Sequence, residues 1–270
     1  MQQTELSVII VNYNGLKYLK DCFESLKEKL QGIDFEIVVA DNNSTDESCN
    51  FIKQHYPEVV LIESPENLGF GRGNNLAVAY SNGKYLLLLN NDTIILDNLL
   101  PVLQKLKSDK TIGAIGIKML DKNRMYLNSV GKFPSPANLF RIKSISRTDG
   151  VFSSGNFSED VYEADWVGGS FIMMPKKVYE EINGFDPDYF MYVEDVDLCK
   201  KIADKGYKRL FMPNYSYIHF VGYNKSKDHL ILNGYDLYIE KHFSGPAKKL
   251  SQLSLGVNKL VKKTKKMFGI

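Results

Sequence analysis

Short apolar runs alternate with longer amphipathic stretches along the first half of the chain. Each run is four to six residues long, rich in aliphatic side chains and followed by polar residues. Runs of this kind are typical of strands that are buried on both faces of a parallel sheet. The runs predicted as strands cover residues 6–11, 35–40, 59–62, 86–89 and 112–117.

Amphipathic helices are predicted between these strands, because apolar residues recur there at three- and four-residue spacing. Ser44 and Glu47 have the spacing of a capping box, so the second helix should begin near residue 45 or 46. A Gly-rich stretch at 66–75 precedes the third helix, and its backbone amides could approach a phosphate, although it matches neither a Rossmann fingerprint nor a P-loop. The alternation predicts an α/β fold, with an open, mostly parallel sheet and helices on both faces.

Polar side chains end three of the predicted strands. The ends read Asn12-Tyr13, Asp41 and Asn90-Asn91-Asp92. Each of them alone is explained by a solvated turn. Together they predict a ligand site, because open α/β sheets bind ligands at the carboxyl ends of their strands. Asp92 offers hard oxygen to Mg²⁺ or Mn²⁺, and Asn90 can support it through its side-chain amide.

The second half of the chain has a weaker pattern. No helical period is sustained over residues 121–163, which are predicted to form long irregular connections near the site. Trp166 is interpreted as a core or rim aromatic residue, and Gly168-Gly169 predicts that another group approaches the backbone closely. Further strands are predicted at residues 171–174, 207–211 and 215–219.

Three acids, Glu194, Asp195 and Asp197, stand at the start of a predicted helix that ends at Gly206. The helix dipole favours acids in a first turn, so the pattern fits a structural role as well as a catalytic one. His219 ends the last predicted strand. It is either a structural histidine or a metal ligand that binds through a neutral imidazole.

Two more helices are predicted near the C-terminus. The first runs from Leu230 toward Phe243, and Gly245-Pro246 interrupts the chain after it. Residues 247–270 contain lysines and no carboxylates, and their apolar residues lie close to a helical period. This basic amphipathic tail suits a terminal helix packed on the domain or a helix on an anionic membrane surface, and the pattern does not separate the two.

Composition narrows the class of protein. The 270 residues are 44% hydrophobic and 24% charged, which is globular, and a net charge of +2 argues against a nucleic-acid partner. The three cysteines lack CxxC spacing and the N-terminus lacks a signal-peptide pattern, so a reduced, cytoplasmic protein is expected. No apolar stretch approaches membrane-spanning length.

The motifs and their order resemble the inverting GT-A-type glycosyltransferases of family two, especially bacterial rhamnosyltransferase-like members that build surface polysaccharide. The matching motifs span about residues 6–222 and read SVIIVNYNG, VVADNNSTD, ENLGFGRGNN, LLLLNNDT, WVGGSFIMMP, EDVDLC and HFVG. The resemblance implies a GT-A fold, Rossmann-like, with a C-terminal helical extension. The implied parts are a catalytic domain at 1–222, with a nucleotide-binding half at 1–118 and an acceptor-binding half at 119–222, a helical extension at 223–246 and the basic tail at 247–270.

The resemblance also implies residue roles. Asp41 would accept a hydrogen bond from N3–H of uracil or thymine, and Arg72 would reach the phosphates. Asp195 would be the general base, with a low to normal pKa because a helix N-terminus favours its anion. The nucleotide-sugar site would comprise Asn12, Tyr13, Asp41, Asn67, Arg72, Asn90 and Asn91, the acceptor site Trp166, Gly169 and Glu194, and the metal site Asp92 and His219.

One departure concerns the metal motif, where Asn90-Asn91-Asp92 carries one carboxylate and the family often has two. The metal is therefore expected to need the nucleotide phosphates as ligands too. The resemblance implies transfer of a sugar from a UDP- or dTDP-linked donor, such as dTDP-rhamnose, to a hydroxyl of a saccharide or lipid-linked acceptor. The transfer would invert the anomeric centre, use Mg²⁺ or Mn²⁺, and take place in the cytoplasm, with the tail on the inner face of the plasma membrane. A sugar nucleotidyltransferase and a non-catalytic carbohydrate-binding protein remain open as alternatives.

Overall fold

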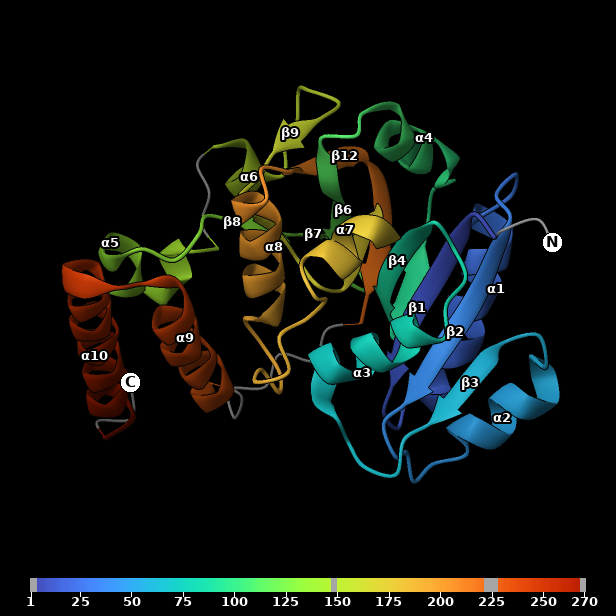
Figure 1. The fold of residues 1–270 in the computed structure, drawn as a ribbon, viewed down its shortest axis with the longest axis horizontal. Helices are drawn as coiled ribbons and strands as arrows, with labels where there is room; N and C mark the ends of the chain where they lie inside the picture. The colour runs from blue at the N-terminus through green and yellow to red at the C-terminus, as the bar shows by residue number, and fades with distance from the viewer. Residues whose placement is uncertain (1–3, 147–149, 221–227, 268–270) are drawn as a thin grey trace.

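The computed structural model describes residues 4–146, 150–220 and 228–267, and a mixed sheet forms its centre (Figure 1). The strands of this sheet lie in the order β3-β2-β1-β4-β11-β6-β12-β5. Their bounds are β1 Leu6–Asn12, β2 Phe35–Asp41, β3 Val60–Glu63, β4 Tyr85–Asn90, β5 Thr93–Ile95, β6 Ile112–Leu120, β11 Phe171–Pro175 and β12 Lys208–His219.

The N-terminal half of the sheet is parallel, as the sequence predicts. β1 pairs in parallel with both β2 and β4, and β2 pairs in parallel with β3. β11 then runs antiparallel between β4 and β6, while β12 is parallel to β6 and antiparallel to β5. The carboxyl ends of β1, β2 and β4 therefore meet at one edge, beside the start of β11.

Helices cover both faces of the sheet, so alternate strand residues enter two different cores. Val8 and Ile10 pack with α1 and α4 on one face, whereas Ile9 packs with α3, α7 and α8 on the other. The predicted α/β architecture is confirmed. The bounds of these helices and of α2 are α1 Leu16–Lys29, α2 Ser48–His55, α3 Gly69–Ala79, α4 Leu100–Ser108, α7 Lys176–Glu181 and α8 Glu194–Asp204.

The predicted capping box is wrong. The helix α2 begins at Ser48, and Ser44 Oγ instead accepts a hydrogen bond from the Asn14 backbone N–H over 2.8 Å. Asp46 Oδ1 accepts hydrogen bonds from the backbone N–H and the hydroxyl of Ser48. The polar run after β2 is thus used in a turn that faces the neighbouring strand β1, and the helix starts after it.

The Gly-rich stretch lies mostly inside α3 and does not form an open phosphate loop. A Cβ at Gly71 would lie 3.1 Å from Phe185 Cβ, and one at Gly73 would lie 2.9 Å from Val11 Cγ1. These glycines let α3 approach the sheet and the segment before α8. Tertiary packing of a helix explains the motif better than phosphate binding.

The region at 121–163 consists of short elements joined by irregular connections, as expected. The two strands predicted at 207–211 and 215–219 are one long strand, β12, with an irregularity between Met212 and Ser216. The short elements are β7 Tyr126–Leu127, β8 Val130–Gly131, α5 Pro136–Leu139, the 3₁₀ helix η1 Ile142–Ser144, α6 Val151–Ser154 and β9 Tyr162–Glu163. The strand β10 Trp166–Val167 follows this region and pairs with β8.

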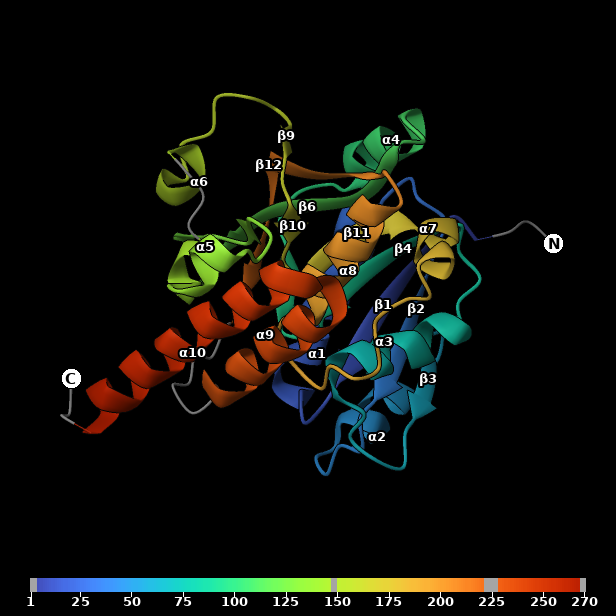
Figure 2. The ribbon, with the colours of Figure 1, turned by 60° about the vertical axis from the view of Figure 1, so that its left-hand side comes forward.

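Two C-terminal helices, α9 Asp228–His242 and α10 Gly245–Met267, lie side by side against α5 and α8 (Figures 1 and 2). The predicted helical extension is confirmed. The division into domains stays a prediction: the boundary after residue 118 falls within β6, and the one after 222 lies outside the described residues, as do Val221 and Gly222 of the HFVG motif.

Candidate functional site

A chain of side-chain hydrogen bonds joins the ends of β1, β2 and β4. Asn12 Nδ2 donates to Asp41 Oδ2 over 2.7 Å, and Asn12 Oδ1 accepts from Asn91 Nδ2 over 2.7 Å. Gly15 makes room for this contact, since a Cβ there would lie 2.0 Å from Asn91 Nδ2. The three polar strand ends predicted from the sequence therefore form one network.

Asp41 lies at the buried end of that network, with 1% of its surface exposed. Its Oδ1 accepts from the Ser44 backbone N–H over 2.8 Å and its Oδ2 from Asn12. Asp41 thus fixes Asn12 and the turn at Ser44, and its contact with a nucleotide base stays a prediction. Ser44 was missed as a site residue, although it stands three positions after Asp41 in the same polar run.

Other residues expected to bind the nucleotide lie nearer the surface. The Tyr13 ring is exposed. Arg72 projects from α3, and its Nη2 lies 3.3 Å from Glu66 Oε1 in a solvent-exposed ion pair, which is a weak kind of contact that a phosphate can replace. Asn67 Oδ1 accepts from the Gly69 backbone N–H over 2.9 Å and so shapes the start of α3.

The predicted metal ligands Asp92 and His219 are in direct contact. His219 Nε2 lies 3.1 Å from Asp92 Oδ1 and 3.1 Å from Asn90 Nδ2. They meet because β5 folds back on β12, where His219 pairs with Thr93, and because the Phe220 N–H donates to the Asp92 carbonyl over 3.0 Å. The metal site implied by the resemblance put these two residues together, whereas the strand β5 that brings them into contact was not predicted from the sequence.

The side chains of Asn90, Asp92 and His219 fit a divalent cation. In the described part of the chain no three His, Cys, Asp or Glu residues are grouped to hold a metal. However, Asn90 Oδ1 is buried without a hydrogen-bond partner next to the Asp92 and His219 pair. A carboxylate, an imidazole and an amide oxygen together suit Mn²⁺, and phosphate oxygens of a bound nucleotide can complete the coordination.

Asp195 is held between its own helix and the turn before β11. Its Oδ2 accepts from the Gly169 backbone N–H over 2.9 Å, and its Oδ1 accepts from the Val196 N–H over 2.8 Å. A Cβ at Gly169 would lie 3.2 Å from Asp195 Cβ, so the group that was predicted to approach this glycine is Asp195.

The expected low to normal pKa of Asp195 is wrong. Burial raises its pKa, and the two backbone hydrogen bonds only partly oppose that effect. Its neighbour Glu194 is buried with Oε2 unpaired, and burial, followed by the charge of Asp195, raises the pKa of Glu194 to about 8. The raised pKa favours the neutral form of Glu194, which reduces the negative charge around Asp195.

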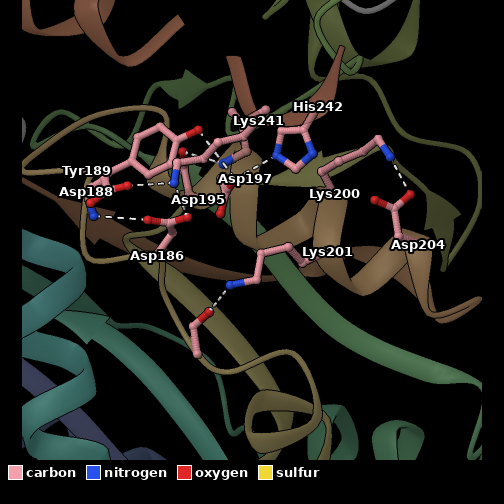
Figure 3. A network of polar contacts seen from close by, with 12 residues as sticks. Asp186, Asp188, Tyr189, Asp195, Asp197, Lys200, Lys201, Asp204, Lys241 and His242 are labelled. Carbon is pink, nitrogen blue, oxygen red and sulfur yellow. Dashed lines mark hydrogen bonds and ion pairs between the residues drawn. The ribbon is translucent and has the colours of Figure 1, made fainter. Parts of the chain in front are cut away.

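Asp197 points away from Asp195, as expected for residues two positions apart on a helix (Figure 3). Its Oδ1 lies 2.7 Å from His242 Nε2 and accepts a longer hydrogen bond, 3.4 Å, from the Tyr189 hydroxyl. The three acids of this turn thus have different surroundings, and Asp195 is the one that contacts the Gly168-Gly169 turn.

Backbone groups of two adjacent residues, Gly169 and Ser170, connect Asp195 with the end of β4. The Gly169 N–H binds Asp195, and the Ser170 carbonyl accepts from the Asn90 N–H over 3.2 Å. The candidate base and the candidate metal ligands therefore lie at the same edge of the sheet.

Trp166, expected in the acceptor site, is part of the core. It is 9% exposed, and its Nε1–H donates to the Lys132 carbonyl over 3.0 Å. Its ring packs so closely on Gly131 that a Cβ there would lie 2.3 Å from Trp166 Cζ2. The polar atom of the indole is thus already used, and packing explains this tryptophan without a ligand.

Comparison with known proteins gives one family. The model described as glycosyl transferase family 2 matches residues 7–181, which include Asp41 and Asp92 but end before Asp195 and His219. Rhamnosyltransferase WbbL of Escherichia coli (strain K12) is 30% identical over 225 residues, which cover 79% of this chain and 82% of that protein. N-acetylglucosaminyl-diphospho-decaprenol L-rhamnosyltransferase of Mycobacterium tuberculosis (strain CDC 1551 / Oshkosh) is 25% identical over 262 residues, covering 87% of this chain and 83% of that protein.

Solved structures agree in fold. GalNAc-T7 with UDP, GalNAc and Mn²⁺ matches with a TM-score of 0.65 and 15% identity, over 95% of this chain and 55% of that one. The mannosyltransferase PcManGT from Pyrobaculum calidifontis, in complex with GDP-Man and Mn²⁺, matches with a TM-score of 0.62 and 15% identity, over 99% and 76% of the two chains. At this identity the likeness bears on the fold alone, and the expected GT-A fold is confirmed.

Proposed function

Because the chain belongs to glycosyl transferase family 2 and is a glycosyltransferase, we propose that it moves L-rhamnose from a nucleoside-diphosphate donor to a hydroxyl of a lipid-linked saccharide during synthesis of a cell-surface glycan. The names of two relatives, both rhamnosyltransferases and one acting on a diphospho-decaprenol, support the sugar and the acceptor class. The observation that supports the reaction is the backbone connection through Gly169 and Ser170 between Asp195 and the end of β4, the strand that Asp92 follows and at whose end Asn90 contacts His219.

The chain's own residues suggest how the transfer proceeds. Asp195 accepts the proton of the acceptor hydroxyl, whose oxygen forms a bond to the anomeric carbon as the bond from that carbon to the diphosphate breaks. Attack from the face opposite the leaving group inverts the anomeric centre, and no enzyme nucleophile is required. A divalent cation bound by Asp92 and His219 would neutralise charge on the departing diphosphate. Arg72 can add a guanidinium to the same phosphates.

The test is a donor screen with purified protein, Mn²⁺ and a synthetic diphospholipid-linked saccharide. We expect turnover with dTDP-L-rhamnose, release of the nucleoside diphosphate, and an inverted anomeric centre by NMR. Release of pyrophosphate from a sugar phosphate and a nucleoside triphosphate would identify a nucleotidyltransferase instead. Absence of nucleotide-sugar binding in calorimetry, with retained saccharide binding, would identify a carbohydrate-binding protein.

We also propose that α10 contacts an anionic membrane surface, near the lipid-linked acceptor. The helix packs by one face: Leu255 is buried, and Lys259 pairs with Asp236 of α9. The opposite face carries a stripe of exposed apolar residues at helical spacing, flanked by the exposed Lys249 and Lys263. The exposed members of this stripe are Leu250, Leu253, Leu260 and Val261. The sequence left open whether this helix packs on the domain or lies on a membrane surface. In this proposal the two contacts use opposite faces of the same helix.

No helix in the described part of the chain is long and apolar enough to cross a bilayer, so the proposed contact is with the surface. The test is flotation with vesicles that contain phosphatidylglycerol or only phosphatidylcholine. Leu253→Glu should weaken binding to the anionic vesicles, because it puts a carboxylate into the stripe. Tyr80→Glu makes the same charge change at an exposed ring directly after α3 and should leave binding intact. Equal binding of both variants would overturn this proposal, and a dimer disrupted only by Leu253→Glu would assign the stripe to a second copy of the chain.

A further inference from the structure

The turn that leads into α8 has an unusual backbone, and α9 packs directly on it. Tyr192 and Val193 have φ angles of 70° and 73°, a left-handed region that is unfavourable for a β-branched residue. Gly234 of α9 faces them. A Cβ at Gly234 would lie 2.8 Å from the Tyr192 carbonyl oxygen and 2.8 Å from Val193 Cγ2. Only a glycine at position 234 lets α9 come this close to the turn that precedes Asp195.

The C-terminal end of α9 contacts the first turn of α8, which follows Tyr192 and Val193 directly (Figure 3). His242, the last residue of α9, has its Nε2 2.7 Å from Oδ1 of Asp197, which is 1% exposed. Lys241 Nζ lies 2.7 Å from carboxylates of both Asp186 and Asp188, in the segment that approaches the turn. The turn before α8 therefore contacts the middle of α9, and the first turn of α8 contacts its C-terminal end.

We infer that α9 belongs to the catalytic apparatus and that His242 is a positioning residue, which fixes the first turn of α8 through Asp197 and so holds Asp195 against the Gly169 N–H. This inference rests on the proposed role of Asp195 as the base. Asp197 contacts α9 and Asp195 contacts the Gly168-Gly169 turn, so the first turn of α8 is held between two fixed groups. A buried carboxylate that loses its hydrogen-bond donor moves or takes up a proton, and either change releases the turn.

A positioning residue affects kcat alone, whereas a residue that only stabilises the fold also affects the number of donor sites. The predicted donor-binding residues lie on or directly beside β1, β2, β4 and α3, and the hydrogen bonds and ion pairs described for them do not involve α9, so donor affinity should not depend on His242. The orientation of Asp195 should depend on it. Misplacement of a catalytic group by about 1 Å can lower turnover roughly 10²-fold. Loss of His242 should therefore lower kcat and leave the donor KM and the number of donor sites unchanged.

The experiment compares His242→Phe, His242→Gln and the control His55→Gln in the full-length enzyme. Phe keeps a ring beside Tyr238, whose centroid is 4.3 Å from the imidazole, but cannot donate to Asp197. Gln places an amide N–H near the position of Nε2. His55 is an exposed histidine at the end of α2. We expect kcat to fall roughly 10–100-fold in His242→Phe, to recover most of the way in His242→Gln, and to be unchanged in His55→Gln. Calorimetry with the donor should give full stoichiometry in each.

An unchanged kcat in His242→Phe overturns the inference. A loss of kcat that parallels a loss of donor sites reports unfolded protein, and an unchanged kcat in Gly234→Ala then overturns the inference. Gly234→Ala gives an independent measurement should His242→Phe not fold: it presses on Tyr192 and Val193 and should lower kcat without changing donor KM. If the wild type itself transfers no sugar, the proposed function fails. If the wild type is active, Asp195→Asn is inactive and both α9 variants are normal, only the inference about α9 fails.

Discussion

Replacing Asp195 by asparagine tests the central assignment, because it removes the basicity of the side chain and nearly preserves its shape. The carboxylate accepts one backbone N–H on each oxygen, from Gly169 and from Val196. An asparagine can accept only one of the two, since its other terminal atom is an N–H donor. The variant should fold, because its cost is limited to one hydrogen bond.

Two magnitudes follow for this variant. Loss of a general base lowers turnover by about 10²–10⁴-fold, which is roughly 3–5 kcal/mol of activation free energy. The N–H that loses its acceptor costs about 1–3 kcal/mol of stability, and relief from burying a carboxylate offsets part of it. A chain of this size loses about 2–4 °C in Tm per kcal/mol, so the expected decrease in Tm is a few degrees.

The assay is release of nucleoside diphosphate at saturating donor and acceptor, with donor affinity from calorimetry. Asp195→Asn should lose turnover and keep donor affinity. Asp204→Asn makes the same substitution on the last turn of α8, where the carboxylate is exposed and pairs with Lys200, and it should be silent. Near-normal turnover of Asp195→Asn, together with a large loss in Glu194→Gln, would show that the neighbouring acid is the base.

Three further changes test other parts of the site. Asp92→Asn should weaken binding of the nucleotide sugar in the presence of Mn²⁺ and have little effect in its absence, and an unchanged Mn²⁺ dependence in calorimetry contradicts the metal assignment. Burial raises the pKa of Glu194 from 4.5 to about 8. Between these values the folded state keeps a proton that the unfolded state releases, so the free energy of unfolding should fall as pH rises. Glu194→Gln should flatten that decline in Tm, and parallel curves for both proteins refute the shift. Gly73→Ala should cost about 1–3 kcal/mol, because its Cβ would lie 2.9 Å from Val11 Cγ1, and an unchanged Tm would show that the helix can move away at no cost.

The sequence predicts the edge of the sheet where the site forms, because parallel strands that end in polar residues must end side by side. Asn12, Asp41 and Asn91 meet for that reason. The environment of each side chain is a property of packing and could not be predicted in the same way. The pKa of Asp195 depends on which groups cover it, and the helix dipole alone gave the wrong direction. Likewise, no local pattern distinguishes a tryptophan that packs on Gly131 from one that binds a sugar.

Contacts between residues far apart in the chain were the least predictable part of the site. His242 reaches Asp197 across 45 positions, and neither residue has a sequence neighbourhood that marks the other. His219 was identified as a candidate ligand, but its contact with Asp92 depends on the short strand β5, which the periodicity did not reveal. The glycines of α3 had a visible pattern whose cause, close packing, lay in other segments of the chain.

The backbone connection through Gly169 and Ser170 has a consequence for how enzymes with this site can diverge. Main-chain atoms of two adjacent residues link the β4 edge to Asp195, so peptide geometry fixes the spacing between the end of β4 and the proposed base. The segment at 121–163 enters the chain before this link and supports the turn that carries it, because the Gly168 N–H donates to the Ser129 carbonyl over 2.7 Å and β8 pairs with β10. A chimaeric transferase that exchanges this segment should therefore keep Ser129 and the strand β8, because their loss would displace the turn that holds Asp195.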